Sequence, residues 1–375
     1  IPGDDLVLTV DRSLQYQVEQ ALLAGINKPT VMAKGASAVI LDSSTGEVLA
    51  MANVDRDKAG NAKVTAANNA AVAAHEPGSV AKVFSISASV NEGIASPDTT
   101  INVPPYIIFG EGTPYQHIVR DAESHDTGPM TLRQILVQSS NIGTWLTAKQ
   151  LGSQKLAAYL TAFGFGSTTA LDFPGESAGL IKPWQNWQGT ENATVTYGYG
   201  YSATALQLVS AVNTIANGGI YVAPKLVKAV VDSSGKMVST PPSASHQVVT
   251  AATAQQMTSM MTDVVCSKKG TGYLAQIPGM TVAGKTGTAY KVQAGGGYQS
   301  ADGQRAYFAT FVGFFPATNP KVTILVSVDE PDPTSNDRFG GTASAPIFVD
   351  LAQAAIHELQ ISPAPGDHGC PAPTR

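Results

Sequence analysis

The sequence predicts an α+β fold in which helices cover a β-sheet and an all-helical lobe lies beside it. Strand-like segments lie toward both ends of the chain, whereas helical periodicity dominates the middle, from residue 79 to about 217. The chain has 375 residues, 43% of them hydrophobic and 14% charged, which is enough apolar material for a large buried core. This balance excludes a disordered chain and a coiled coil.

The N-terminal segments predict one strand, one helix and one hairpin. Residues 6–10 form a short strand pattern, and Asp11-Arg12-Ser13 is a helix start, so we expect a helix to about residue 23. Residues 36–51 alternate around a Ser-Ser-Thr-Gly turn, which is typical of a β-hairpin.

The later elements follow from the same patterns. Pro/Gly-rich loops at 95–130 and 172–190 interrupt the helical middle. Helices are expected at 79–91, 131–151, 153–164, 204–217, 251–265 and 342–358. Strands are expected at 226–231, 236–238, 281–283, 306–314 and 321–328.

Charge and apolar runs limit the possible partners. The net charge is −5, and no basic run is longer than Lys268-Lys269, so we expect no nucleic-acid partner. The longest apolar stretches, 308–315 and 322–328, are far shorter than the ~20 residues of a membrane span. The first residues lack the features of a signal peptide, and we expect a fragment whose targeting segment has been removed. No His or Cys cluster has metal-ligand spacing, so we expect no metal and no cofactor.

Two cysteines, Cys266 and Cys370, leave two interpretations open. They could form a disulfide that closes a loop of roughly 100 residues. Alternatively they are unrelated thiols, one buried and one in a frayed tail. A location outside the cytosol would favour the disulfide.

The first motif with chemical potential is Ser79-Val-Ala-Lys82, which follows a Pro-Gly break. Its spacing puts an amine and a hydroxyl on one face of a helix start. A serine is a weak nucleophile until a base takes its proton, and a lysine can be that base only if its pKa is lowered. Alone the motif is weak: it recurs at Ser233–Lys236 across a hairpin turn, and the alternative is a helix cap beside a solvated lysine.

The second motif is Ser139-Ser140-Asn141. Its polar residues interrupt an otherwise apolar helical pattern, so we expect them to be partly buried and to need partners. A junction between two helices, capped by Ser and Asn, is the structural alternative.

The third motif is Gly284-Lys285-Thr286-Gly287-Thr288, which follows a strand-like segment. Alternating Thr and Lys on a strand edge, with glycines that allow close backbone approach, suits a ligand that carries a carboxylate. Residues 279–286 also satisfy the P-loop pattern. However, the four intervening residues have strand composition, and nothing after them favours a helix, which a phosphate loop needs.

Together, the three motifs in this order and spacing resemble the active site of the penicillin-binding proteins, DD-transpeptidases whose superfamily includes the serine β-lactamases. The resemblance implies a central antiparallel sheet flanked by helices, plus the helical lobe. It extends over segments 7–15, 38–51, 197–219, 309–316 and 340–346. The monofunctional class B group is the nearest, since a class A chain would carry a glycosyltransferase domain before residue 1.

The same resemblance implies the domain organisation. We expect a transpeptidase domain over 1–362 and a Pro-rich tail over 363–375. A mainly helical lobe, about 80–225, is expected between the sheet-forming segments 30–60 and 226–358.

The resemblance also implies a role for each motif residue. Ser79 would be the nucleophile, Lys82 its base, and Ser139 the relay of a proton to the leaving amine. Asn141 would orient Lys82 and the substrate amide, and Lys285 would keep the site positive and so help to lower the Lys82 pKa. The substrate-binding residues would be Thr286, Gly287 and Thr288, and the backbone N–H groups of Ser79 and Thr288 would form an oxyanion hole.

The implied function is cross-linking of peptidoglycan stem peptides through a Ser79 acyl-enzyme, with release of D-alanine and inhibition by β-lactams. The implied partners also include division or elongation proteins. The implied location is the outer face of the cytoplasmic membrane, through an N-terminal anchor absent from this chain. Two alternatives stay open: a serine β-lactamase, although the usual Glu-x-x-x-Asn loop has no counterpart here, and a non-catalytic β-lactam sensor.

Overall fold

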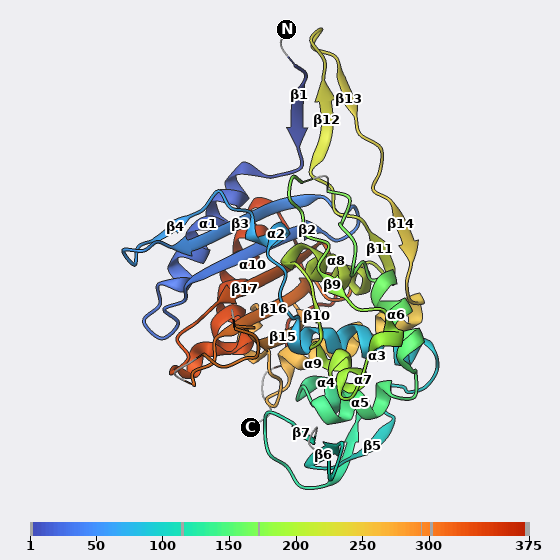
Figure 1. Cartoon of the computed structure of the whole chain (residues 1–375). Helices are drawn as coiled ribbons and strands as arrows, with labels where there is room; N and C mark the ends of the chain where they lie inside the picture. The colour runs from blue at the N-terminus through green and yellow to red at the C-terminus, as the bar shows by residue number, and fades with distance from the viewer. Residues whose placement is uncertain (1–2, 114–115, 172, 294, 301–302, 372–375) are drawn as a thin grey trace.

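The computed structural model describes residues 3–113, 116–171, 173–293, 295–300 and 303–371 (Figure 1). Its centre is one antiparallel six-stranded sheet in the order β15-β16-β17-β2-β3-β4. Both ends of the chain contribute to it, because β17 pairs with β2 along its whole length. The predicted α+β class is therefore confirmed. The strands are β2 (Gly35–Asp42), β3 (Val48–Arg56), β4 (Ala62–Val64), β15 (Ala283–Tyr290), β16 (Tyr307–Phe315) and β17 (Val322–Asp329).

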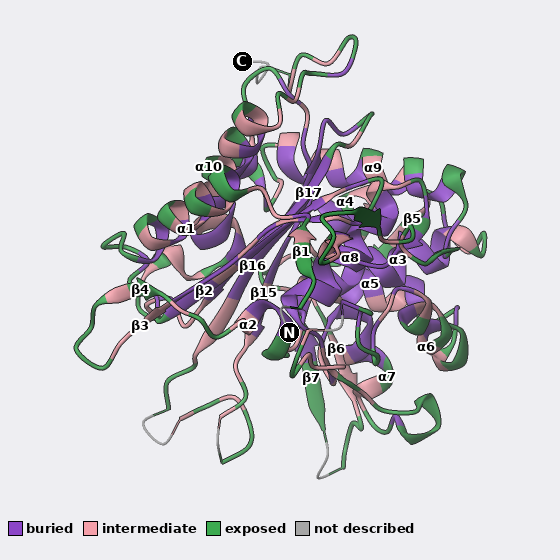
Figure 2. Ribbon diagram, turned by 90° about the horizontal axis from the view of Figure 1, so that it is seen from above, coloured by how far each residue is buried: buried purple, intermediate pink, exposed green. Residues whose placement is uncertain are grey.

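Two helices lie side by side on one face of the sheet, α1 (Arg12–Ile26) and α10 (Ala345–Glu358) (Figure 2). The predicted cap begins α1, since the Asp11 side chain accepts a hydrogen bond from the Leu14 amide (2.8 Å). Apolar side chains from both helices, including Leu14 and Phe348, are fully buried in one core with the sheet. This layer covers one face of the sheet and leaves the other face for the lobe.

The helical lobe covers the other face, and α8 (Ala205–Ala216) joins it to the sheet. The Asn213 side chain of α8 donates to the Ser43 carbonyl (3.1 Å) and accepts from the Thr323 hydroxyl (2.6 Å), so buried polar groups tie α8 to two strands. The other helices are α2 (Asn69–Val72), α3 (Lys82–Asn91), α4 (Leu132–Val137), α5 (Asn141–Ala148), α6 (Ser153–Ala162), α7 (Glu191–Thr194) and α9 (Ala251–Cys266). Short 3₁₀ turns precede α3, follow α7 and lie at Trp184–Asn186, Tyr273–Ala275 and Asn336–Arg338.

The structure corrects three sequence expectations. The region 95–130 is not only loop: it contains two antiparallel strand pairs, β5 with β8 and β6 with β7. The helix expected over 131–151 is broken at Ser139, whose φ of 58° is incompatible with a continuous helix. The strand expected at 281–283 begins at Ala283 instead and continues to Tyr290. The strands of the first correction are β5 (Thr100–Val103), β6 (Tyr106–Phe109), β7 (His117–Arg120) and β8 (Gly128–Thr131).

A small three-stranded sheet projects from the body, with β12 between β1 and β13 (Figure 1). The predicted turn between β12 and β13 contains Ser233 and Lys236, both exposed. The strands of this small sheet are β1 (Asp5–Leu8), β12 (Val227–Val231) and β13 (Met237–Ser239). The remaining short strands, outside this sheet, are β9 (Leu180–Ile181), β10 (Tyr201–Ser202), β11 (Ile220–Val222) and β14 (Ser245–Gln247). Within the described residues, no helix is both long and apolar enough to cross a membrane.

The C-terminal segment is attached to the body rather than frayed. Cys266, the last residue of α9, forms a disulfide with Cys370, with their Cα atoms 5.1 Å apart. Nearby, the Asp367 carboxylate accepts hydrogen bonds from the amide and the hydroxyl of Thr281, just before β15. The described part of the predicted tail, 363–371, therefore packs beside the sheet.

Replacing both Cys266 and Cys370 by serine is expected to lower the free energy of unfolding by about 4–5 kcal/mol. The disulfide closes a loop of 104 residues, and its loss restores that conformational freedom to the unfolded chain. The midpoint of urea unfolding measures the change. Reduced wild-type protein is the control and should behave like the double variant; an unchanged midpoint in both would contradict the prediction.

Candidate active site

Ser79 and Lys82 lie at the junction of a 3₁₀ turn (Gly78–Ala81) and α3. Ser79 is half-buried and Lys82 is fully buried. The Lys82 Nζ atom lies 2.8 Å from the Ser79 Oγ atom. A helix start that follows a Pro-Gly break therefore holds the amine against the hydroxyl, whereas the identical spacing at Ser233 and Lys236 lies in an exposed turn.

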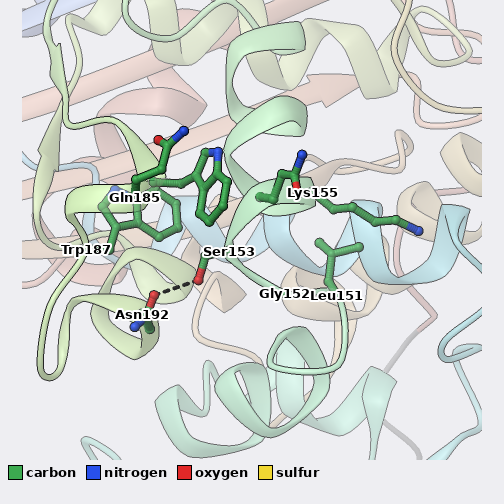
Figure 3. Close-up of a pocket in the computed structure, with 9 residues that line it drawn as sticks. Leu151, Gly152, Ser153, Lys155, Gln185, Trp187 and Asn192 are labelled. Atoms are coloured by element: carbon green, nitrogen blue, oxygen red, sulfur yellow. Dashed lines mark hydrogen bonds between the residues drawn. The ribbon is translucent and has the colours of Figure 1, made fainter.

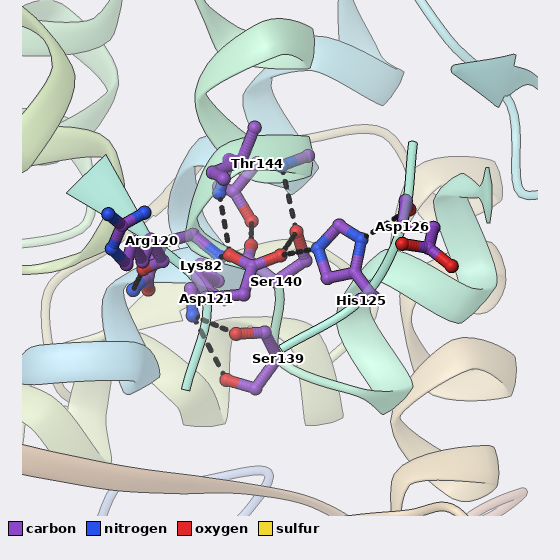
Figure 4. Close-up of polar contacts among 11 residues, drawn as sticks. Lys82, Arg120, Asp121, His125, Asp126, Ser139, Ser140 and Thr144 are labelled. Atoms are coloured by element: carbon purple, nitrogen blue, oxygen red, sulfur yellow. Dashed lines mark hydrogen bonds and ion pairs between the residues drawn. The ribbon is translucent and has the colours of Figure 1, made fainter. Parts of the chain in front are cut away.

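Ser139 completes this contact from the break between α4 and α5. The Lys82 Nζ atom donates to the Ser139 carbonyl (2.5 Å) and lies 3.0 Å from its Oγ atom (Figure 4). The left-handed backbone of Ser139 points both oxygens toward the amine. A capping box between Thr131 and Gln134 begins α4, and the Ser140 hydroxyl caps α5, so both neighbouring helices fix the turn.

Lys285 approaches the same hydroxyl from β15. Its Nζ atom, also fully buried, lies 2.9 Å from the Ser139 Oγ atom and 2.9 Å from the Thr286 carbonyl oxygen. One hydroxyl thus bridges two amines, and the three sequence motifs meet at a single point. The motif lies inside β15, and the next element of the described chain is the strand β16 rather than a helix, so the arrangement is not that of a phosphate loop.

The two amines have lowered pKa values. Burial lowers the pKa of Lys82 to about 7, against the opposing effect of the Asp121 charge, which raises it. Burial also lowers the pKa of Lys285 well below its usual value, and the charge of Lys82 adds to the effect. Burial is thus the main cause of the lowered Lys82 pKa, and the expected contribution of Lys285 stays a prediction. At neutral pH a substantial fraction of Lys82 is the uncharged amine, which can accept a proton.

The edge strand β15 lies against the turn that carries Ser79. A Cβ atom on Gly287 would lie only 2.9 Å from a Val80 methyl carbon, so the missing side chain permits this close approach. Thr286 is buried and its hydroxyl donates to Thr271 (2.7 Å). Thr288 is half-buried and its hydroxyl accepts from the Gly340 amide (3.1 Å).

Asn141 differs from its expected place. Its side-chain nitrogen donates to the Arg120 carbonyl (3.1 Å), and among the hydrogen bonds of the described residues none joins Asn141 to Lys82. Asn141 is the first residue of α5, and its side chain contacts the end of β7. The carbonyl of Ser139, rather than the amide of Asn141, holds the Lys82 amine here.

Asp121, which the motifs did not predict, supports this turn. Its side chain is only 7% exposed and accepts hydrogen bonds from Ser140, Asn141, Ile142 and His125 (Figure 4). A lone acidic residue in a Pro/Gly-rich segment carries no signal in the sequence. Only folding brings Asp121 close to the turn at Ser139.

A pocket of about 560 Å³ lies elsewhere, at the start of α6 (Figure 3). Two tryptophans, Trp184 and Trp187, form part of its lining together with Lys155 and Asn192. None of the three motifs lines it, so it is separate from the cluster around Ser79. Among the described residues, no group of three or more His, Cys, Asp or Glu side chains could hold a metal ion.

A hydroxyl beside a buried amine, between a helical lobe and the edge of an antiparallel sheet, is the arrangement that active-site-serine acyltransferases use. The comparison with known families names the particular group. The chain belongs to the penicillin-binding protein transpeptidase family, because the family model described as "Penicillin binding protein transpeptidase domain" matches residues 36–353. The related proteins are class B penicillin-binding proteins.

Similar proteins support this assignment over nearly the whole chain. Penicillin-binding protein PbpB of Mycobacterium tuberculosis is 36% identical over 380 residues, covering 98% of this chain and 54% of that protein. Peptidoglycan D,D-transpeptidase FtsI of Escherichia coli is 32% identical, covering 96% of this chain and 57% of its own length. The chain thus spans little more than half of these relatives. The crystal structure of penicillin-binding protein 3 from Mycobacterium tuberculosis complexed with ampicillin matches with a TM-score of 0.85 and 34% identity, covering 100% of this chain and 83% of that one.

Proposed function

We propose that this chain is the catalytic domain of a class B peptidoglycan D,D-transpeptidase that links stem peptides through a Ser79 acyl-enzyme and is inhibited by β-lactams. The observation that carries the proposal is the continuous contact from Ser79 through Lys82 and Ser139 to Lys285. Family membership and the ampicillin and aztreonam complexes of a similar protein support it.

In the proposed mechanism, the Ser79 oxygen attacks the carbonyl carbon of the penultimate D-alanine while uncharged Lys82 takes its proton. The backbone N–H groups of Ser79 and Thr288 stabilise the negative charge on the carbonyl oxygen. The C–N bond then breaks, and Ser139, which contacts Lys82, passes a proton to the departing D-alanine amine. Finally the amine of a second stem peptide attacks the ester, forms the cross-link and returns the proton to Ser79.

The remaining site residues bind and orient the substrate in this proposal. The negative charge of the bound terminal carboxylate raises the lowered pKa of Lys285, so that Lys285 provides positive charge for this group. Thr286, Gly287 and Thr288 receive the carboxylate along the edge of β15. Asn141, whose side-chain nitrogen is held by Arg120, orients the substrate amide through its oxygen.

The finer identity and location are also proposed. The motifs and the segments around them resemble the division-associated penicillin-binding protein A, and the similarity to FtsI and PbpB supports a role beside division or elongation proteins. The disulfide between Cys266 and Cys370 supports a location outside the cytosol, at the outer face of the membrane, through an anchor preceding residue 1. We also propose one transpeptidase domain over 1–362, with a Pro-rich tail beyond it.

Two assays on the purified chain test the function. With a chromogenic cephalosporin, we expect one stoichiometric burst followed by a stall; rapid steady turnover would instead indicate a β-lactamase. With a stem-peptide donor and an amine acceptor, we expect D-alanine release and a cross-linked product. Normal β-lactam labelling without any acyl transfer from the stem peptide would contradict the proposal and indicate a sensor.

The acylation rate should depend on pH through Lys82. The pKa of this group is about 7, and only its uncharged form can take the Ser79 proton, so the rate should be half-maximal near pH 7. Below that pH it should fall about tenfold per pH unit, since the amine is progressively protonated. Stopped-flow measurement of cephalosporin acylation between pH 5 and 9 checks this. A rate that stays constant down to pH 5 would contradict a lysine base.

A further inference from the structure

The segment between β7 and β8 places a buried carboxylate behind the catalytic turn. One oxygen of Asp121 accepts from the backbone amides of Asn141 (2.6 Å) and Ile142 (3.0 Å) at the start of α5. The other accepts from the Ser140 hydroxyl (2.6 Å). A carboxylate in this place satisfies helix-terminal N–H groups and interacts favourably with the helix dipole.

Ser140 transmits this contact to the turn. Its hydroxyl donates to Asp121 and accepts from the Gly143 amide (2.8 Å), while its carbonyl accepts from the Thr144 hydroxyl (2.7 Å). The residue directly before it is Ser139, held at a φ of 58°. Asp121 therefore fixes the start of α5 one peptide away from the oxygens that hold Lys82.

His125 holds Asp121 in turn. Its Nε2 atom lies 3.0 Å from an Asp121 carboxylate oxygen, and its Nδ1 atom lies 2.9 Å from the Asp126 carbonyl oxygen. Both oxygens can only accept hydrogen bonds, so both contacts are formed at once only when the ring carries two protons. The Asp126 carbonyl and the Asp121 carboxylate accordingly raise the pKa of His125. In its doubly protonated form, His125 forms a partly buried ion pair with Asp121 behind the active site (Figure 4).

We propose that Asp121 is a positioning residue of this site: it fixes the turn at Ser139, and its negative charge, partly offset by His125, controls the protonation of Lys82. The inference rests on the proposed function, in which Lys82 is the base. The Asp121 charge opposes the effect of burial on the Lys82 pKa. Without it, burial would lower that pKa further.

Other charged and titratable groups lie around the pair. Lys285 faces Lys82 from β15 and has a lowered pKa of its own. Arg120 precedes Asp121, but its guanidinium lies over the Tyr106 ring, 5.1 Å from the ring centroid. Burial and the Asp121 charge both raise the pKa of Tyr197, which therefore stays neutral over the working pH range.

The test is the pH profile of cephalosporin acylation in three variants, each removing one group. For Asp121→Asn we expect the midpoint to move down by roughly 0.5–1 pH unit, together with a lower plateau rate. For His125→Gln, which leaves the carboxylate without its cation, we expect a smaller shift in the opposite direction. Glu123→Gln is the matched control: it removes an exposed carboxylate of the same segment and should leave the profile unchanged.

A lost contact alone would lower the plateau rate without moving the midpoint, so the midpoint decides. If Asp121→Asn has the same midpoint as Glu123→Gln, the proposal is wrong. If Asp121→Asn does not fold, His125→Gln decides alone: an upward shift supports the proposal and an unchanged midpoint overturns it. Wild-type acylation at Ser79 is measured in the same series, so a failure of the proposed function itself is seen separately.

Discussion

A Ser79→Ala variant is expected to carry no covalent β-lactam adduct, whereas the wild-type chain gains one adduct per molecule. The Ser79 oxygen, 2.8 Å from the buried Lys82 amine, is the proposed nucleophile, and alanine has no oxygen to acylate. Intact-mass spectrometry after penicillin exposure measures the adduct, and peptide mapping locates it.

The chain provides a matched control for this experiment. Ser233 and Lys236 repeat the Ser-x-x-Lys spacing in the exposed turn between β12 and β13. A Ser233→Ala variant should therefore label like the wild type. An adduct that persists in Ser79→Ala, or that maps to any other serine, would show that the nucleophile has been assigned wrongly.

The contrast between these two serines shows what the sequence can predict. Both motifs have identical spacing, but only the first follows a Pro-Gly break and opens an apolar helical segment. The residues around Ser79 left two interpretations open, a solvated lysine beside a helix cap or a base with a lowered pKa, and the structure has a fully buried amine. Around Ser233 the Ser-Ser-Gly sequence predicts a hairpin turn, and the structure has this turn, exposed. Local context, more than the motif itself, distinguishes the two.

The order of the strands in the sheet was harder to predict than the motifs. Alternation identified its strands at both ends of the chain, but the pairing of β17 with β2 joins residues almost 300 positions apart. The resemblance to a known family implied a central antiparallel sheet but not which strands pair. The short strands β5 to β8 were missed because four-residue segments between prolines and glycines give no period to detect.

The sequence predicted the motif residues of the site but not the residues that hold them in place. Ser139 and Lys285 contact each other because the break between two helices lies beside the edge of the sheet. The motifs do not predict this contact by themselves; the resemblance to a known family does. The support from Asp121 and His125 comes from a segment without regular periodicity, and two of the hydrogen bonds that Asp121 accepts come from backbone amides. Every residue except proline has a backbone N–H group, so no residue pattern marks these partners of the carboxylate.

The burial of Lys82 links folding to catalysis. A lysine whose pKa is lowered on folding binds fewer protons in the folded chain than in the unfolded chain between about pH 7 and its usual value of 10.5. The contribution of Lys82 to the free energy of unfolding is therefore complete above pH 10.5, and it is lost as pH falls toward 7. At neutral pH the protein is therefore less stable than it would be with an apolar side chain at this position. The proposed catalytic base thus lowers the stability of the folded chain.

Replacing Lys82 by methionine separates these two effects. Methionine has a similar length and no charge, so the variant should fold, and it should lose the part of the pH-dependent stability that Lys82 contributes between pH 7 and 10.5. At the same time the acylation rate should fall by about 10²- to 10⁴-fold, because no base takes the Ser79 proton. The residual rate should also lose its dependence on pH near 7. Urea unfolding at several pH values and stopped-flow acylation measure the two effects.

Lys236→Met is the control, since it removes the exposed lysine of the second Ser-x-x-Lys sequence and should change neither quantity. The combination of results is what identifies the base. A Lys82→Met variant that is folded, loses the pH-dependent stability and still acylates at the wild-type rate would show that Lys82 is buried for structural reasons only. Lys285, the other buried amine within reach of the Ser139 hydroxyl, would then be the group to examine as the base. A variant that acylates slowly but keeps the acid limb near pH 7 would point the same way, because the group that titrates there would still be present.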